Sequence, residues 1–286
     1  MVSRELLLSN STKLGGIIVS YFRIVMPAYN NADTIGRAIS SVLRQTFEDW
    51  ELIIVDDCST DGTLDTALGY KDDRIHFYQL KKKRFNGGTR NYALYETDEA
   101  IDSIYTLFLD ADDEFCYAES FQHLYDLAES NGRPDMIRLA YNRKYDNEIG
   151  FWYKGQVVSM IGSIAKEQSL EDTAKSSCVA CWTKAVRSEM VQPFPEDTLM
   201  EDVIQHLKQV DTCRNMIVLP EAFVTWHRRN KSTSHVQGEK WKESAFQHIK
   251  NLKALKGTFK HDYVEDRLEY KIKFCTDKLM QGRFEQ

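Results

Sequence analysis

Three aspartates that follow an apolar segment are the residues of this chain best suited to chemistry. Residues 105–109 are a run of apolar and β-favouring side chains, and Asp110, Asp112 and Asp113 come directly after it. A buried parallel strand has this composition, and ligands bind where such strands end. Three carboxylates this close repel one another unless a cation lies between them. Mg²⁺ and Mn²⁺ prefer carboxylate and phosphate oxygens, so we expect one of these ions at the rim of a sheet. A helix N-terminus, where the macrodipole favours acids, is the structural alternative.

Two further acid pairs lie at the ends of expected elements. Asp56 and Asp57 follow the apolar run 50–55, and Glu201 and Asp202 begin a helix. The helix carries an apolar stripe at three- and four-residue spacing: Val203, Leu207 and Val210. For this second pair, too, acids favoured in the first turn of a helix are the structural alternative.

Strands and helices alternate in the first half of the chain. Strands are expected at 23–26, 50–55, 74–78 and 105–109, and helices are expected to begin near residues 33, 63 and 86. This alternation predicts a doubly wound parallel sheet. Because parallel strands end at the same edge of a sheet, Asp56, Asp57, Asp110 and Asp112 should lie along one edge.

The pattern is less regular after Glu119. A helix is expected to end near Ser130, and another is expected to follow Trp182-Thr183-Lys184. Strands are expected at 136–141, 149–153, 216–218 and 222–226. The C-terminal segment has an apolar stripe at helical spacing, which predicts either core packing or a dimer face. The stripe consists of Val264, Leu268, Ile272, Cys275 and Leu279.

The composition excludes a generally basic nucleic-acid-binding protein. With 37 basic and 43 acidic residues, the net charge is −6, although basic residues gather at 81–84 and 227–231. No apolar run approaches the ~18 residues of a membrane span, and the runs within residues 1–22 are too short for a signal peptide. The six cysteines are irregularly spaced and fit no disulfide framework. We therefore expect a cytoplasmic protein in a reducing compartment.

Taken together, the motifs resemble those of glycosyltransferase family 2, the inverting sugar-nucleotide enzymes of the GT-A fold. The resemblance covers roughly residues 23–235, with the motifs in the family's order. The motifs are Pro27-Ala28-Tyr29-Asn30, Gln45, 50–57, 59–63, 88–91, 110–113, Trp182-Thr183-Lys184, Glu201-Asp202 and 227–234. Two positions depart from the family: Thr89 stands where alanine is usual, and loop 81–84 is more basic than expected.

The resemblance implies a Rossmann-like α/β/α sandwich with a mostly parallel central sheet and a helical C-terminal extension. It divides the chain into four parts. These are an N-terminal extension (1–22), a nucleotide-sugar-binding half (23–115), an acceptor-binding and catalytic half (116–235) and the C-terminal helices (236–286).

The resemblance also assigns a nucleotide-sugar site. Pro27, Tyr29 and Asp57 resemble residues of a nucleoside pocket, where a carboxylate that accepts a uracil N–H would select the base and the tyrosine ring would pack on it. Arg90 would reach the same nucleotide, and Gly88 would let the backbone approach it, unless that glycine only opens a helix. The full set is Pro27, Ala28, Tyr29, Asn30, Asp56, Asp57, Gly88, Arg90, Asp110, Ala111, Trp182, Arg228, Ser232 and Ser234.

The remaining acids take the catalytic roles by the same resemblance. Asp110 would contact the ribose or the donor sugar, and Asp112 would bind the metal. Asp202 resembles the general base, which must reach the acceptor hydroxyl on the face opposite the leaving group, and Glu201 would assist it.

Charge that develops on the departing nucleoside diphosphate needs compensation. The cation and Arg228 would supply it, and Ser232 or Ser234 would donate hydrogen bonds. His227 is either a second metal ligand or a histidine packed after a strand.

We therefore expect an inverting glycosyltransferase that moves a sugar from a UDP-sugar to a hydroxyl of a glycan, a lipid-linked acceptor or an anionic polymer. One alternative is a glycosyltransferase that acts on modified DNA. A sugar nucleotidyltransferase would need a glycine-rich loop after the first strand. An inactive nucleotide- or carbohydrate-binding module would be expected to lose the base or the D-x-D motif. The C-terminal helices could also pair two copies into a homo-oligomer.

Overall fold

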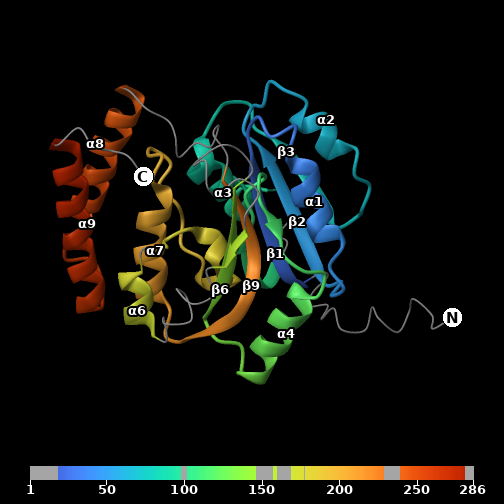
Figure 1. The fold of residues 1–286 in the computed structure, drawn as a ribbon. Coiled ribbons are helices and arrows are strands. Elements are labelled where there is room, and N and C mark those ends of the chain that lie inside the picture. The colour runs from blue at the N-terminus through green and yellow to red at the C-terminus, as the bar shows by residue number, and fades with distance from the viewer. Residues whose placement is uncertain are drawn as a thin grey trace.

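The protein is an α/β sandwich in which one mixed sheet is covered by helices on both faces (Figure 1). This computed structural model describes residues 19–97, 102–145, 157–159, 169–176, 178–228 and 239–280. The predicted fold class is confirmed. None of the helices in these ranges is long and apolar enough to cross a lipid bilayer.

Four parallel strands form the first half of the sheet. They are β1 (Val19–Ala28), β2 (Trp50–Asp56), β3 (Ile75–Gln79) and β4 (Asp102–Phe108), with β1 between β2 and β4. The side chains of β1 and β2 are almost all buried, which is why these segments are nearly continuous apolar runs. The sequence predicts all four strands, although β1 begins at Val19 rather than at residue 23. The parallel register places the carboxyl ends of β1, β2 and β4 side by side, as expected.

The helices of this half connect the strands and cover both faces. They are α1 (Ile35–Leu43), α2 (Thr63–Leu68) and α3 (Phe85–Tyr95). Figure 1 shows α1 and α2 on one face of the sheet and α3 on the other. The predicted apolar stripe of α1 is buried at Ile35, Ile39 and Val42.

The second half of the sheet mixes parallel and antiparallel pairs. Its strands are β5 (Glu114–Phe115), β6 (Met136–Tyr145), β7 (Val157–Ser159), β8 (Lys184–Arg187) and β9 (Met216–Arg228). The order is β3-β2-β1-β4-β8-β6-β9-β5, with β7 on β6. The β6–β9 pair is parallel, whereas β8 runs antiparallel to both β4 and β6. The sheet is therefore wholly parallel in its first half and mixed in its second, where the long β6–β9 pair is parallel and the pairs made by β8 are antiparallel.

Local predictions in this half differ from the structure. The helix expected after Trp182 is a short 3₁₀ turn followed by β8, because pairing with β4 and β6 outweighs the modest strand propensity of Lys-Ala-Val-Arg. The two strands expected at 216–218 and 222–226 are one strand, β9. Pro220 lies where the register with β6 shifts, in a bulge that needs no proline N–H. The strand expected at 149–153 lies outside the described residues.

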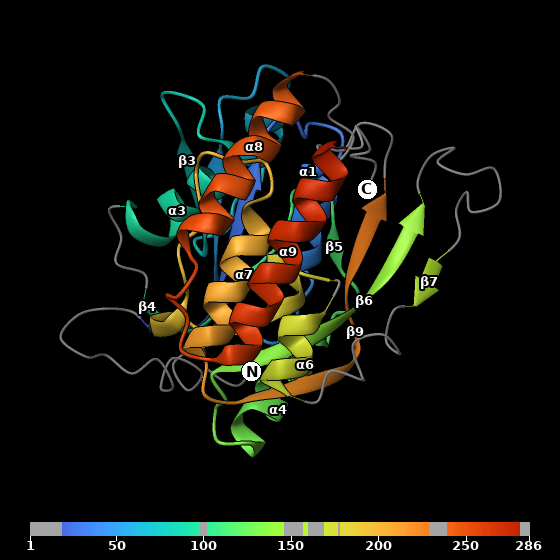
Figure 2. The ribbon, with the colours of Figure 1, turned by 90° about the vertical axis from the view of Figure 1, so that its left-hand side faces the viewer.

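In the second half of the chain, two C-terminal helices form a layer outside helix α7 (Glu201–Thr212). The other helices of this half are α4 (Ser120–Ser130), α6 (Leu170–Lys175), α8 (Glu239–Ala254) and α9 (Asp262–Met280). Helix α7 lies on the same face as α3, and Figure 2 shows α8 and α9 in front of α7. The predicted stripe on α9 is buried at Val264, Leu268, Ile272 and Cys275 against α6, α7 and α8. The stripe therefore packs within the chain and is not a dimer face.

The interface between α8 and the body contains a buried histidine that should make the protein sensitive to acid. His248 is fully buried, and neither ring nitrogen has a hydrogen-bond partner among the described residues. Burial, with a smaller contribution from Lys271, lowers the pKa of His248 to about 4. The unfolded chain would therefore bind a proton between about pH 6.5 and pH 4 that the folded chain does not.

Through His248 alone, we expect the free energy of unfolding to fall by about 3 kcal/mol as the pH drops from about 6.5 to about 4. Below about pH 4 this contribution should change no further. Urea unfolding at a series of pH values measures the effect. His248→Leu should flatten the slope, whereas His123→Gln, a change at an exposed histidine, should not. Equal slopes for the parent protein and His248→Leu would contradict the assignment.

Candidate active site

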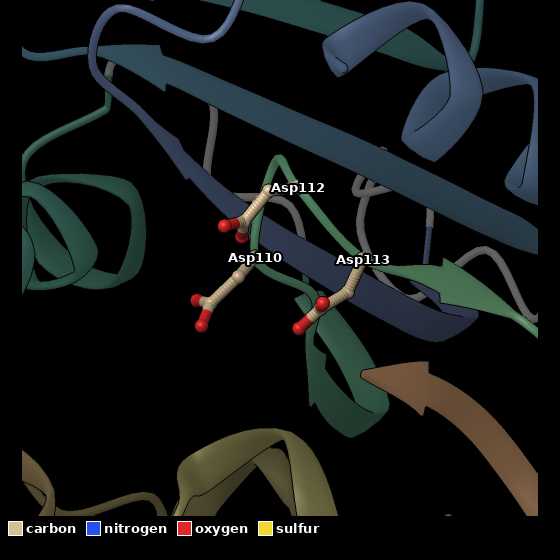
Figure 3. Close-up of side chains that lie close together, drawn as sticks. All are labelled: Asp110, Asp112 and Asp113. Carbon is tan, nitrogen blue, oxygen red and sulfur yellow. The ribbon is translucent and has the colours of Figure 1, made fainter. Parts of the chain in front are cut away.

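The three aspartates after β4 form the acidic cluster expected from the sequence. One ligand oxygen from each of Asp110, Asp112 and Asp113 lies within 4.8 Å of the others. Figure 3 shows that all three carboxylates point to the same side of the loop between β4 and β5. The sequence predicts all three aspartates on the rim of the sheet. Asp110 and Asp112 are partly exposed there, but Asp113 is 1% exposed and lies below the rim. The chain turns back into β5 at this residue, which carries the third carboxylate inward.

The cluster fits a divalent cation. Oδ2 of Asp113 is buried without a hydrogen-bond partner among the described residues. Burial and the charges of Asp112 and Asp110 raise the pKa of Asp113 well above its usual range. A cation between the carboxylates would satisfy the orphaned oxygen and relieve the repulsion. The sequence predicts a cation among the three aspartates, with Asp112 and, as one of two alternatives for that residue, His227 as ligands. Beside Asp112, the geometry makes a buried oxygen of Asp113 a candidate ligand.

His227 lies beside this cluster rather than within it. Its backbone N–H donates to Oδ1 of Asp113 at 2.8 Å, and its Nε2 lies 2.9 Å from Oε1 of Glu114. The ring is fully buried, and the interaction lowers the pKa of Glu114. On the other side of the loop, Arg37 of α1 donates to the Asp112 carbonyl at 2.5 Å. His227 and Arg37 thus hold the loop that presents the acids.

Arg90 connects the acidic cluster to helix α7. Its guanidinium donates to Oδ1 of Asp110 and to Oε1 of Glu201, both at 2.7 Å, and the side chain is 1% exposed. Burial and the neighbouring Asp202 raise the pKa of Glu201 to about 7, against the opposing effect of Arg90. Both carboxylates occupy the guanidinium, so the structure uses Arg90 to join two segments of the site. The nucleotide contact expected of Arg90 stays a prediction.

Asp202 is the second residue of α7 and follows Glu201. Its charge contributes to the raised pKa of Asp110, whose main cause is burial. Oδ1 of Asp202 accepts the backbone N–H of Cys181 at 3.3 Å. Lys184 holds the same loop from behind, because its buried ammonium donates to the carbonyls of residues 179 and 180 at 2.9 and 2.8 Å. Asp202 and Asp110 of the acidic cluster therefore lie near enough for their charges to interact.

The residues expected to bind the nucleoside lie at the ends of β1 and β2. Asp57 is buried, and its two oxygens accept the N–H groups of Arg84 and Phe85 at 2.6 and 2.9 Å, which caps α3. Asp56 is also buried, and its Oδ2 accepts from Ser59 N–H at 3.1 Å. The β2 acids thus shape the loops around them, and each oxygen has further lone pairs for a ligand.

The loop after β1 presents Tyr29. Pro27 and Ala28 are the last residues of β1, and the Asn30 side chain accepts the Thr60 N–H at 2.9 Å, which ties this loop to the loop after β2. Tyr29 is 38% exposed, and the Lys83 ammonium lies over its ring, 2.9 Å from the centroid. A base that packs on this face of Tyr29 would have to displace Lys83.

The glycines of α3 serve packing. A Cβ on Gly87 would lie 2.1 Å from the Pro195 carbonyl oxygen, and one on Gly88 would lie 2.7 Å from the Cβ of Arg84. Asn91 exchanges hydrogen bonds with the backbone of Phe194 at 2.8 and 2.9 Å. Gly87 and Asn91 therefore dock the segment that leads into α7, while the nucleotide approach expected of Gly88, like its helix-opening alternative, stays a prediction.

The other expected site residues differ in burial, and two of them lie outside the described part of the chain. Ala111 is buried within the acidic loop, and Trp182 is buried next to Cys181. Arg228 is half-buried at the end of β9. Ser232 and Ser234 lie outside the described residues.

Comparison with known proteins agrees with this geometry. A family model described as glycosyl transferase family 2 matches residues 23–189. The chain is 28% identical over 178 residues to the Escherichia coli UDP-Glc:alpha-D-GlcNAc-diphosphoundecaprenol beta-1,3-glucosyltransferase WfgD, covering 60% of this chain and 62% of WfgD. It is 38% identical over 113 residues to the Staphylococcus aureus (strain N315) poly(ribitol-phosphate) beta-N-acetylglucosaminyltransferase TarP, covering 38% of this chain and 33% of TarP. The chain thus spans less than two thirds of either relative.

The structure is also similar to the crystal structure of S. aureus TarS in complex with UDP-GlcNAc. The TM-score is 0.66 with 23% identity, and the match covers 87% of this chain and 70% of that chain. This likeness confirms the GT-A fold that the sequence motifs imply.

Proposed function

Because the chain belongs to glycosyltransferase family 2, we propose that it transfers a sugar from a UDP-sugar to an acceptor hydroxyl with inversion of configuration. The observation that carries the proposal is the convergence of two sets of carboxylates. Arg90 joins Asp110, which follows β4, to Glu201, which precedes Asp202 at the start of α7. A donor-binding group and a base are thereby held in fixed relation, as an in-line displacement requires.

The proposed roles follow from the positions of the side chains. Asp202 accepts the proton of the acceptor hydroxyl as its oxygen attacks the sugar. Asp110 contacts the ribose or donor sugar, with Arg90 fixing its orientation. Mg²⁺ or Mn²⁺ held by Asp112, with Asp110 and Asp113, would neutralise charge on the departing diphosphate. By resemblance to the family, Arg228 at the end of β9 would add a second positive charge.

The acceptor in this proposal carries phosphate. The names of both relatives include it: WfgD acts on a diphosphoundecaprenol-linked sugar and TarP on poly(ribitol-phosphate). Phosphate near the hydroxyl that reacts would favour arginine on the acceptor side of the site.

Divalent metal should control UDP binding. Removing metal with EDTA, or replacing Asp112 by asparagine, should weaken UDP about 10- to 100-fold, because the diphosphate would then face an acidic cluster without compensation. Isothermal titration calorimetry with UDP, with and without MnCl₂, measures this. Asp126→Asn, at an exposed aspartate of α4, is the matched control and should bind as the parent protein does.

The same preparations, mixed with a panel of UDP-sugars and assayed for UDP release, identify the donor. UDP affinity that is the same with EDTA and with Mn²⁺ would rule out the metal role. Absence of metal-dependent UDP binding, together with no UDP release from any donor in the panel, would favour the inactive module instead.

A further inference from the structure

A cluster of aromatic rings and guanidinium groups, called here the Trp226 platform, lies on one face of the β6–β9 pair. Its members are Tyr141, Arg143, Trp182, Trp226 and Arg228. The Tyr141 and Trp182 rings meet edge to face with centroids 5.1 Å apart, and the Trp182 and Trp226 centroids are 6.1 Å apart. Figure 2 shows β6 and β9 side by side, running out from the body of the sheet.

Two arginines flank the outermost ring of the platform. Arg143 is the cross-strand partner of Trp226, and Arg228 follows Trp226 by two residues, so all three side chains lie on the same face. The guanidinium carbons lie 4.8 and 5.9 Å from the Trp226 ring centroid. Tyr141 and Trp182 are buried, whereas Arg143, Trp226 and Arg228 are half-buried and reach solvent. The buried rings thus support a partly open surface.

The platform is attached to the candidate active site at both ends. Trp182 follows Cys181, whose N–H donates to Asp202. Trp226 precedes His227, whose N–H donates to Asp113. A molecule lying on the platform would therefore extend from a point beside the proposed base and beside the acidic cluster.

We propose that the Trp226 platform is an acceptor subsite that binds a phosphate group next to the sugar or polyol unit that is glycosylated. This proposal rests on the proposed function. Aromatic faces pack against the C–H surfaces of sugars and polyols. Guanidinium groups bind phosphate through paired, charge-assisted hydrogen bonds. Against the opposing effect of burial, Tyr141 and Tyr145 raise the pKa of Arg143, so the guanidinium stays charged beside the Trp226 ring.

The test compares two substitutions on opposite faces of β6. Arg143→Gln removes a charge from the platform, and Lys144→Gln removes the same charge from the opposite face. Calorimetry measures binding of two phosphate-bearing probes, a ribitol-phosphate oligomer and a sugar joined through diphosphate to a short alkyl chain. Cellotetraose serves as the neutral probe. The tighter phosphate-bearing probe identifies whether the phosphate is a polymer phosphodiester or a diphosphate.

Arg143→Gln should weaken that probe about tenfold and reduce the salt dependence of its binding, with a much smaller effect from Lys144→Gln. Equal losses in the two variants, no binding of either phosphate-bearing probe by the parent protein, or equal binding of cellotetraose would overturn the proposal. Mn²⁺-dependent UDP binding is measured on the same samples. If UDP binds but the acceptor probes do not, only the subsite proposal fails; if UDP does not bind either, the glycosyltransferase proposal itself fails.

Discussion

Asp202→Asn should lower the turnover number with a true acceptor by about 10²- to 10⁴-fold, which is the usual contribution of a general base. Asparagine keeps the size of the side chain and can still accept the Cys181 N–H, but it cannot take a proton from the acceptor. Because Asp202 lies outside the acidic cluster, Mn²⁺-dependent affinity for UDP should remain close to that of the parent protein.

The measurement is the rate of product formation at saturating donor and acceptor, with UDP affinity from calorimetry as the control for folding. Loss of turnover together with loss of UDP binding would point to a collapsed site rather than to a missing base. Turnover equal to that of the parent protein would remove Asp202 from the catalytic role.

The sequence predicts the first half of the sheet well because its signals are local. Residues 50–55 and 105–109 are buried on both faces, so their composition alone identifies them as strands, and the acids that follow must lie at the shared edge. The apolar stripe at residues 203, 207 and 210 is an equally local signal, and it correctly predicts a helix that begins at the Glu201–Asp202 pair.

The parts that differ depend on contacts between distant segments. The pairing of Lys184 with Arg138 in the sheet decides that β8 is a strand, and neither residue favours a strand by itself. Glu201 and Arg90 are 111 residues apart, and their separation in sequence gives no sign that they meet. A Cβ on Gly87 would meet the backbone of Pro195, and one on Gly88 would meet Arg84 and Glu196, contacts that the sequence does not reveal. A motif can thus mark a functional site while its residues act on the protein itself.

Arg90→Met should destabilise the protein by about 3–5 kcal/mol, which is the typical cost of removing one partner from a buried ion pair. Asp110 and Glu201 would be left beside one another with no positive charge between them, and burial makes the ionised forms costly. Urea unfolding at pH 7.5 measures the loss. Arg133→Met, in a pair with Glu129 whose side chains are 45% and 33% exposed, is the control and should cost less than about 1 kcal/mol.

A second substitution separates this structural role from direct contact with the nucleotide. Adding Glu201→Gln to Arg90→Met removes one of the two stranded charges, so the double variant should be more stable than Arg90→Met alone. Arg90→Lys keeps the charge but cannot reach both carboxylates with a planar fork, and it should fall between the parent protein and Arg90→Met in stability. If Arg90→Lys instead weakens UDP binding while leaving the unfolding midpoint unchanged, the nucleotide contact implied by the sequence motif is the better assignment, and the link between Asp110 and Glu201 is dispensable.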